Sequence, residues 1–347
     1  MIQHLTRPAA LALSILGLSS CNDSLTEPGT TSSAPMGAEA AVAATSNSWV
    51  TRASMPSDRW GLTSAVVPNA SGQSILYAIG GSSASFAQPS GPTTGALTTV
   101  QAYNASTNSW KLRAPLPLPL YRSNGTGVID GKIYVSGGRM SGDKKYVNAL
   151  FVYDPATNTW TRKHDMPEAS WGGVTGVINR KLYVLTCEEA EDCSEFSHLT
   201  LYRYDPGTDQ WTFLSVTPVQ LGLPMGGVIG GKLYVTGGPG GALMAYDPAT
   251  NSWTAKTSLP GRRWSGAGVA YHAQLYILGG FEYNSDLTKR TVRKTSVYDP
   301  ATNTWITKAR MPSARFDLTA SLVFVSGKAR IEAVGGQRPG NNVQYIR

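Results

Sequence analysis

The chain has 347 residues, of which only 15% are charged while 37 are glycine and 21 proline, and its formal net charge is +8. This length can bury a sizeable core in one large or two medium domains. The abundant glycine and proline, without sustained helical periodicity, predict many short strands joined by tight turns rather than long helices. The positive charge would suit nucleic acid, but the basic residues are scattered and the N-terminus predicts export. We therefore expect no nucleic-acid partner.

Residues 1–20 have the pattern of a signal peptide. One arginine precedes the apolar run AALALSILGL, which is too short to span a bilayer. The segment ends in LSSC, which resembles the lipobox of bacterial lipoproteins. That resemblance implies a lipid on Cys21 and a location in the bacterial cell envelope, lipid-anchored, on the periplasmic or surface side of the outer membrane. An ordinary signal peptide with a coincidental cysteine is the alternative.

Residues 21–46 are predicted to be the lipidated cysteine and a flexible tether. Their sequence consists mostly of Ser, Thr, Ala, Gly and Pro, which leaves little to bury. The folded domain is therefore expected to cover residues 47–347.

Two markers recur through that domain about every fifty residues. YDPATNTW occurs at Tyr153–Trp160 and Tyr298–Trp305, with near copies that begin at Tyr103, Tyr204 and Tyr246. A Gly-Gly pair closes an apolar strand in most units, as in IYVSGG, and Thr186-Cys187 replaces it once. Each unit therefore predicts four strands: A resembles GTGVI, B ends at Gly-Gly, C ends at Tyr-Asp and D begins at Trp.

This pattern resembles the kelch motif of β-propellers. The resemblance implies an all-β fold, a six-bladed kelch-type β-propeller. The chain ends with NNVQYIR, a C strand without a D strand, and the domain begins with NSWVTRASMP, a D strand without a C strand. We expect the last blade to be closed by the N-terminal strand, which removes free sheet edges.

The repeated YDPATNTW is interpreted as scaffold. Asp, Pro and Asn supply turn chemistry, and the flanking Tyr and Trp can pack between neighbouring blades. The A–B and C–D loops share one regular face of the propeller. The D–A and B–C loops share the other face, called here the loop face, where their variable sequences predict ligand binding.

Arginine and aromatic residues recur at the start of the A strands, where we expect them to ring the mouth of the central channel. Arginine binds carboxylates, and aromatic faces stack on sugars or peptide groups. Packing between blades, or pairing with loop carboxylates, remains an equally open interpretation. The ligand-binding candidates are Arg59, Trp60, Tyr121, Arg122, Trp171, Arg263, Trp264, Arg315 and Phe316.

The third unit carries the loop CEEAEDCSE. Export favours a disulfide between Cys187 and Cys193, whereas a metal site would have only His198 nearby as a further ligand, so no metal is expected. Glu188 and Glu189 join the ligand-binding candidates, with a solvated loop as the alternative. The corresponding loop of the fifth unit is basic, whereas this loop is acidic.

Kelch propellers include copper radical oxidases, sialic-acid mutarotases and modules that bind proteins or glycans, so the fold alone does not choose a function. The histidines His164, His198 and His272 fall in separate loops, so neither a copper site nor another cofactor is expected. No catalytic motif aligns, and the catalytic residues stay unknown. The hypothesis is an envelope-anchored, non-catalytic binding module that recognises a protein or glycan ligand, including an anionic one, through the loop face and the channel mouth. The alternative is an enzyme similar to sialic-acid mutarotase that acts on an anionic sugar.

Overall fold

The computed structural model describes residues 47–83, 95–141, 146–188, 197–337 and 343–346. The predicted signal peptide and tether, as well as Glu189 and Cys193, lie outside these ranges. The regular elements within them are β-strands. No helix in this part of the chain is long and apolar enough to cross a membrane.

The described residues form six four-stranded antiparallel sheets, which we number as blades 1 to 6. Blade 1 contains β2 (Thr63–Pro68), β3 (Ser74–Ile79), β4 (Val100–Asn104) and β5 (Ser109–Leu112). Blade 2 contains β6 (Thr126–Ile129), β7 (Lys132–Ser136), β8 (Leu150–Asp154) and β9 (Thr159–Lys163). Blade 3 contains β10 (Ser170–Ile178), β11 (Lys181–Glu188), β12 (Thr200–Asp205) and β13 (Gln210–Val216). Blade 4 contains β14 (Met225–Ile229), β15 (Lys232–Thr236), β16 (Leu243–Asp247) and β17 (Ser252–Lys256). Blade 5 contains β18 (Ala267–Tyr271), β19 (Gln274–Leu278), β22 (Thr295–Asp299) and β23 (Thr304–Lys308). Blade 6 contains β24 (Leu318–Val325), β25 (Lys328–Gly335), β26 (Val343–Ile346) and β1 (Ser48–Thr51).

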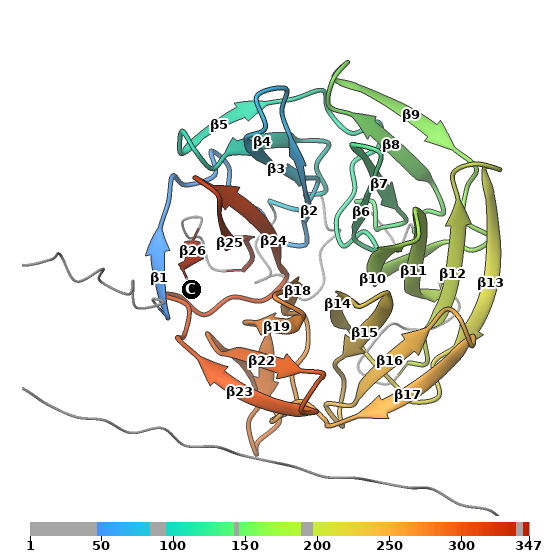
Figure 1. Cartoon of the computed structure of the whole chain (residues 1–347), viewed down its shortest axis with the longest axis vertical. Helices are drawn as coiled ribbons and strands as arrows, with labels where there is room; N and C mark the ends of the chain where they lie inside the picture. The colour runs from blue at the N-terminus through green and yellow to red at the C-terminus, as the bar shows by residue number, and fades with distance from the viewer. Residues whose placement is uncertain (1–46, 84–94, 142–145, 189–196, 338–342, 347) are drawn as a thin grey trace, which may run out of the picture. The chain divides into compact units, whose positions relative to one another are not determined.

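The blades surround a common axis, with the first strand of each blade innermost (Figure 1). The innermost strands contact one another in a closed circuit that runs β2, β6, β10, β14, β18, β24 and back to β2. In blade 6, β1 pairs with β26 from Ser48 opposite Ile346 to Thr51 opposite Val343. The all-β propeller predicted from the sequence is confirmed.

The hydrophobic core lies between adjacent blades. One cluster joins Val67 and Tyr77 of blade 1 to Ile133 and Phe151 of blade 2, all of them buried. Because each blade has an apolar face on either side, it buries that surface only by stacking against its two neighbours. This requirement explains why the strands have long apolar runs instead of strict alternation.

The repeated motif clamps each blade to its neighbour. In blade 2, Asn158 has a left-handed backbone with φ 56°. Its Oδ1 accepts a hydrogen bond from the Tyr153 hydroxyl at 2.6 Å and from the backbone N–H of Ala114, in the segment that follows blade 1, at 2.9 Å. Trp160 Nε1 donates to the carbonyl of Ala114 at 3.0 Å. The scaffolding role predicted for YDPATNTW is confirmed.

Blade 3 differs where Thr186-Cys187 replaces Gly-Gly. The hydroxyl of Thr186 donates to Asn124 Oδ1 at 2.6 Å, and the two strands continue past this point to pair Trp171 with Cys187 and Ser170 with Glu188. Cys187 is buried. Its partner in the predicted disulfide, Cys193, falls outside the described residues, so the disulfide stays a prediction.

Candidate binding site at the channel mouth

One residue with a left-handed backbone stands just before or at the start of the innermost strand of each blade. In five of the blades it directly follows one of the aromatic residues singled out from the sequence. We call this set the mouth ring, and its members are Gly61 (φ 60°), Arg122 (47°), Gly172 (69°), Leu223 (46°), Ser265 (57°) and Asp317 (54°).

Backbone hydrogen bonds join the mouth ring around the channel. The N–H of one member donates to the carbonyl oxygen of the member in the preceding blade. The bonds are Gly61 to Asp317 (2.8 Å), Arg122 to Gly61 (2.6 Å), Gly172 to Arg122 (2.8 Å), Ser265 to Leu223 (3.2 Å) and Asp317 to Ser265 (2.7 Å). The left-handed conformation turns each peptide toward its neighbour, so the mouth has a fixed backbone frame from which side chains project.

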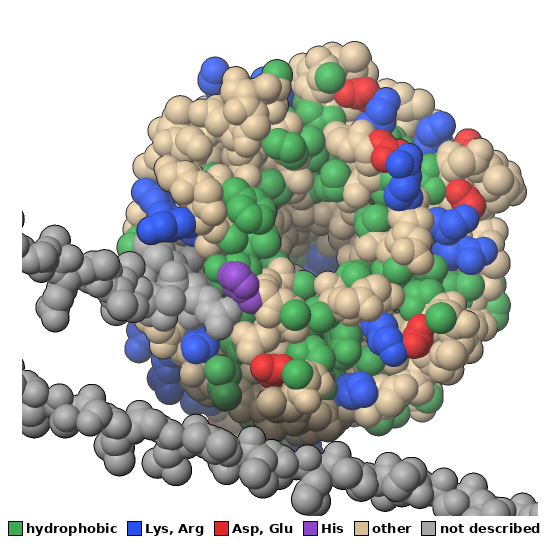
Figure 2. All heavy atoms as spheres, in the orientation of Figure 1, with side chains coloured by type: hydrophobic (Ala, Val, Ile, Leu, Met, Phe, Trp, Pro, Cys, Tyr) green, Lys and Arg blue, Asp and Glu red, His purple; other side chains and the backbone are tan. Residues whose placement is uncertain are grey.

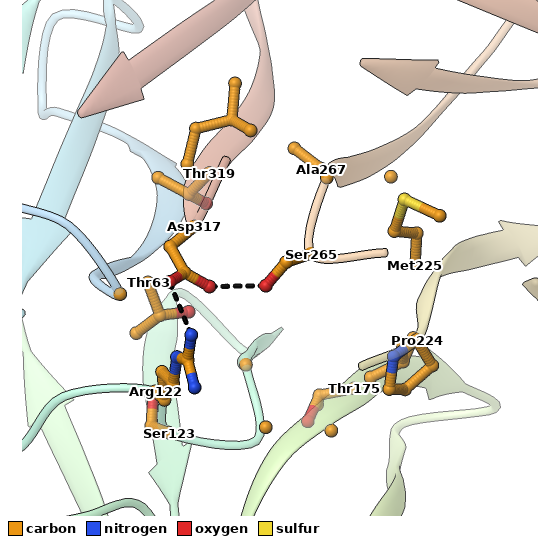
Figure 3. Close-up of a pocket in the computed structure, with 18 of the residues that line it drawn as sticks. Thr63, Arg122, Ser123, Thr175, Pro224, Met225, Ser265, Ala267, Asp317 and Thr319 are labelled. Carbon is orange, nitrogen blue, oxygen red and sulfur yellow. Dashed lines mark hydrogen bonds and ion pairs between the residues drawn. The ribbon is translucent and has the colours of Figure 1, made fainter. Parts of the chain in front are cut away.

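Inside this frame lies a cavity of about 200 Å³. Figure 2 shows the hollow at the centre of the blades, and Figure 3 shows the residues that line it. The lining is largely glycine, serine and threonine, and along its wall Ser64 of β2 and Thr319 of the neighbouring β24 hydrogen bond at 2.7 Å. Pockets that enclose small organic ligands usually measure about 300–1,000 Å³. The channel therefore suits a few water molecules, and a larger ligand would have to sit at its mouth.

An ion pair spans the mouth. Arg122 Nη2 lies 2.6 Å from Asp317 Oδ2, and the Ser265 hydroxyl donates to the other carboxylate oxygen (Figure 3). Arg122 passes over Gly61, where a Cβ would lie 3.0 Å from its Cγ. The absence of a side chain at Gly61 thus lets Arg122 reach Asp317, and the two charges neutralise each other.

Arginine and aromatic side chains form a stack beside this pair. Arg122 Cζ lies 5.5 Å from the Trp60 ring centroid and 5.4 Å from that of Trp171. Arg139 Cζ lies 4.9 Å from the centroid of the same Trp171 ring, 5.3 Å from that of Tyr146 and 5.5 Å from that of Tyr121. Guanidinium groups in this position are attracted by the negative faces of the rings. We call these six residues the arginine–aromatic stack.

Three of the four candidate arginines do not reach the mouth. Arg59, Arg263 and Arg315 are 2%, 0% and 1% exposed and lie within blades 1, 5 and 6. Each donates to the carbonyl of the first glycine in the Gly-Gly pair of its own blade: Gly80 (2.6 Å), Gly279 (3.5 Å) and Gly335 (3.2 Å). Each precedes its aromatic neighbour, whereas Arg122 follows one and occupies the left-handed position of the mouth ring (φ 47°), from which its side chain lines the channel. The structure therefore differs from the expected ring of four arginines.

Burial lowers the pKa of Arg59 and of Arg263 to about 10. Both guanidinium groups stay protonated at neutral pH. Their charge is compensated by carbonyl and side-chain oxygens of the blade, including Gln101 Oε1 at 2.7 Å from Arg59 Nη2. Among the described residues, these arginines stabilise the backbone at the Gly-Gly pair by donating to its carbonyl oxygen.

The candidate tryptophans are also covered. Trp60, Trp171 and Trp264 are 7%, 5% and 2% exposed. Trp171 stacks on Tyr146 with an interplanar angle of 5°, and Trp264 stacks on Phe281 with an angle of 10°. Their faces are occupied by protein side chains, so they do not offer the open surfaces on which a sugar ring would stack.

The second aromatic cluster belongs to blade 5. Phe316 packs edge-on against Phe281 with ring centroids 5.7 Å apart. Phe281 lies in the short hairpin of β20 (Phe281–Tyr283) and β21 (Lys289–Thr291). The next residue, Glu282, is buried and forms ion pairs with Arg290 at 2.8 Å and Lys294 at 2.5 Å. These pairs lower its pKa against the opposing effect of burial, and they partly neutralise the basic loop predicted here.

Sequence reasoning missed Arg139, Tyr146, Ser265 and Asp317. A signal for Arg139 exists, because it directly follows a Gly-Gly pair. That position pairs with the aromatic residue at the mouth, as in Tyr121 opposite Arg139 and Trp264 opposite Phe281. Among the described residues no group of three His, Cys, Asp or Glu side chains could hold a metal ion. Of the acidic candidates, Glu188 ends β11, and Glu189 lies beyond the described part.

Comparison with known proteins agrees with this architecture. Residues 121–167 match the Kelch motif family. The chain is 35% identical over 152 residues to the Kelch-like protein terF of Aspergillus terreus, covering 40% of this chain and 32% of that protein. It is 32% identical over 132 residues to Kelch-like protein 15 of Gallus gallus, covering 37% and 26%. In both cases the match spans a third or less of the relative.

The solved structure of YjhT superposes with a TM-score of 0.65 at 18% identity, over 84% of this chain and 94% of that one. At this identity the similarity concerns the fold. The fold and the mouth thus define an all-β propeller. The matches to the Kelch motif and to Kelch-like proteins support its placement among kelch-repeat proteins.

Proposed function

We propose that this kelch-repeat propeller is an envelope-anchored, non-catalytic module that binds a protein partner through its loop face and channel mouth. A kelch propeller suggests protein binding. Anchoring through a lipid on Cys21 and location in the bacterial cell envelope are parts of the proposal that rest on the leader sequence. The proposal also includes that β1 completes the last of six blades and so closes the propeller.

We favour a protein ligand over a glycan because the faces of the tryptophan rings are covered. Trp60, Trp171 and Trp264 are buried against arginine or aromatic side chains, so sugar stacking would require their displacement. The channel of about 200 Å³ is too small to enclose a ring-shaped substrate with its substituents. What remains at the mouth is a rigid rim whose backbone groups are bonded to one another, and such a preformed surface suits packing against another protein.

A selection experiment tests the proposal. The full-length protein in detergent would be screened against a random peptide library, and hydrogen exchange would locate each binder. We expect protection of the backbone around Tyr146 and of β20 and β21, with unchanged exchange in the turn at His272 on the opposite face. Protection confined to the opposite face would contradict the assignment.

The same protein should be tested for the alternative activity. Incubation with sialic acid followed by NMR would reveal accelerated anomerisation. Acceleration that disappears on Arg122→Ala would overturn the non-catalytic assignment.

Lipidation is tested separately, since radiolabelled palmitate should enter the wild-type protein and not the Cys21→Ser variant. Label in both proteins, or in neither, would contradict the anchor.

A further inference from the structure

Arg139 differs from Arg122 and from the three arginines buried in the blades, because none of the described residues pairs with its charge. Arg122 is neutralised by Asp317, and Arg59, Arg263 and Arg315 are held by oxygen atoms of their blades. For Arg139, no hydrogen bond or ion pair joins the guanidinium to any residue that the structure describes, and its buried Nε lacks an acceptor.

The guanidinium of Arg139 is nevertheless held in place. Rings of Tyr121, Tyr146 and Trp171 lie within 5.5 Å of its Cζ. The backbone is fixed as well, because Arg139 and Tyr121 exchange two hydrogen bonds of 2.8 and 3.0 Å. Side-chain entropy has therefore already been lost, while the residue remains partly exposed. An immobilised cation with unused donors is preorganised for an anion.

We propose that Arg139 recognises the carboxylate of an aspartate or glutamate side chain on the partner protein, through a bidentate hydrogen-bonded ion pair. This inference rests on the proposed protein-binding function. The planar guanidinium matches the two oxygens of a carboxylate, and pairing with a charged partner makes such bonds stronger than neutral ones. Arg122 on the same Trp171 ring does not compete for the carboxylate, because Asp317 already occupies it.

The aromatic rings support this geometry instead of binding the ligand. Stacked Tyr146 and Trp171 are separated by 5.9 Å between centroids, which keeps the guanidinium from folding away from the mouth. Arginine is suited to this position because its flat group packs on rings and donates in plane at the same time. Lysine would retain the charge and the attraction to the rings, but it presents a point charge without the fork of donors.

The test uses the peptides selected on the full-length protein, each also synthesised with its Asp and Glu residues changed to Asn and Gln. We expect the selected peptides to contain acidic residues and to shift the Nε–H resonance of Arg139, which is identified by its loss in Arg139→Lys. Affinity should fall about tenfold in Arg139→Lys, equivalent to about 1.4 kcal/mol, and further in Arg139→Met, which preserves the apolar stem. The exposed Arg310→Lys serves as the matched control and should bind normally.

A double-mutant cycle decides whether the two groups act on each other. Neutral peptides should lose little further affinity when Arg139 is replaced, because the pairing has already gone. Equal binding of acidic and neutral peptides, or normal affinity in Arg139→Lys, would overturn the inference. Inorganic phosphate that competes as well as the acidic peptide would also overturn it, since that would indicate unspecific attraction of anions.

Two outcomes separate this inference from the function on which it rests. Peptides that protect the loop face but are insensitive to Arg139 would refute the carboxylate contact and leave protein binding intact. Glucuronate that shifts the Arg139 resonance when no peptide binds would refute protein binding and assign the carboxylate to a glycan. Melting curves of both Arg139 variants, compared with wild type, show whether a loss of affinity reflects loss of folding.

Discussion

Removal of Asn158 from the inter-blade clamp should lower the stability of the propeller by about 2 kcal/mol. Asn158→Ala removes the Oδ1 acceptor and with it two hydrogen bonds, one donated by the Tyr153 hydroxyl and one by the N–H of Ala114. Because the site is near solvent, each bond contributes at the low end of the usual range, about 0.5 kcal/mol. Alanine at φ 56° adds about 1 kcal/mol of backbone strain.

Two further variants divide this total. Asn158→Gly relieves the strain and should lose about half as much stability, from the hydrogen bonds alone. Asn158→Asp should be nearly neutral at pH 7, because blade 3 has Asp209 at the corresponding position, where it accepts from the Tyr204 hydroxyl at 2.6 Å. Urea unfolding followed by tryptophan fluorescence measures the three changes. An alanine variant as stable as wild type, or an aspartate variant as unstable as alanine, would refute the clamp.

Three other predictions concern the scaffold. The bond from Tyr204 lowers the pKa of Asp209, so its contribution to stability should be present above the unfolded pKa of about 3.9 and lost as pH falls through the lower folded value. Asp209→Asn should therefore reduce the loss of stability between pH 5 and pH 2 on an acid unfolding curve, and an unchanged curve would contradict this. Peptide mapping without reductant should find Cys187 joined to Cys193, and reduction should cost about 2 kcal/mol for so short a loop; free thiols in the native protein would exclude the bond. Deletion of residues 47–51 removes β1 and the bond from Trp49 Nε1 to the carbonyl of Ala309, so it should expose the edge of β26 and promote aggregation, seen by light scattering. A monomeric deletion variant of normal stability would show that β1 does not close the ring.

Much of the fold could be predicted from the sequence, because the blade signals are local. The turn in YDPATNTW needs Asn or Asp at a left-handed position, and the Gly-Gly pair supplies two more such positions, as at Gly137 and Gly138. These local requirements recur in most units, whatever the neighbouring blades contain, and only blade 3 replaces Gly-Gly with Thr186-Cys187 among the described blades. Repetition of the two markers was therefore sufficient to predict strands, their order and the scaffold face.

The composition of the mouth could not be predicted in the same way. Arg59 and Arg122 both adjoin an aromatic residue, and for that reason both were expected in one ring at the mouth. Arg59 precedes Trp60 and is buried in its blade, whereas Arg122 follows Tyr121 at a left-handed backbone position and lies at the mouth. The sequence also held no sign that Asp317, 195 positions along the chain, would neutralise Arg122.

By itself, then, the sequence determined the all-β repeat and the residues available at the start of each A strand. The tertiary structure decided which of them meet. Closing the blades around an axis brings Arg122 of blade 2 to Asp317 near blade 6, covers the tryptophan faces, and leaves Arg139 between three rings without a counter-charge in the described part of the chain. Local turn chemistry is encoded by neighbouring residues, whereas pairing and burial depend on contacts across blades that no short segment contains.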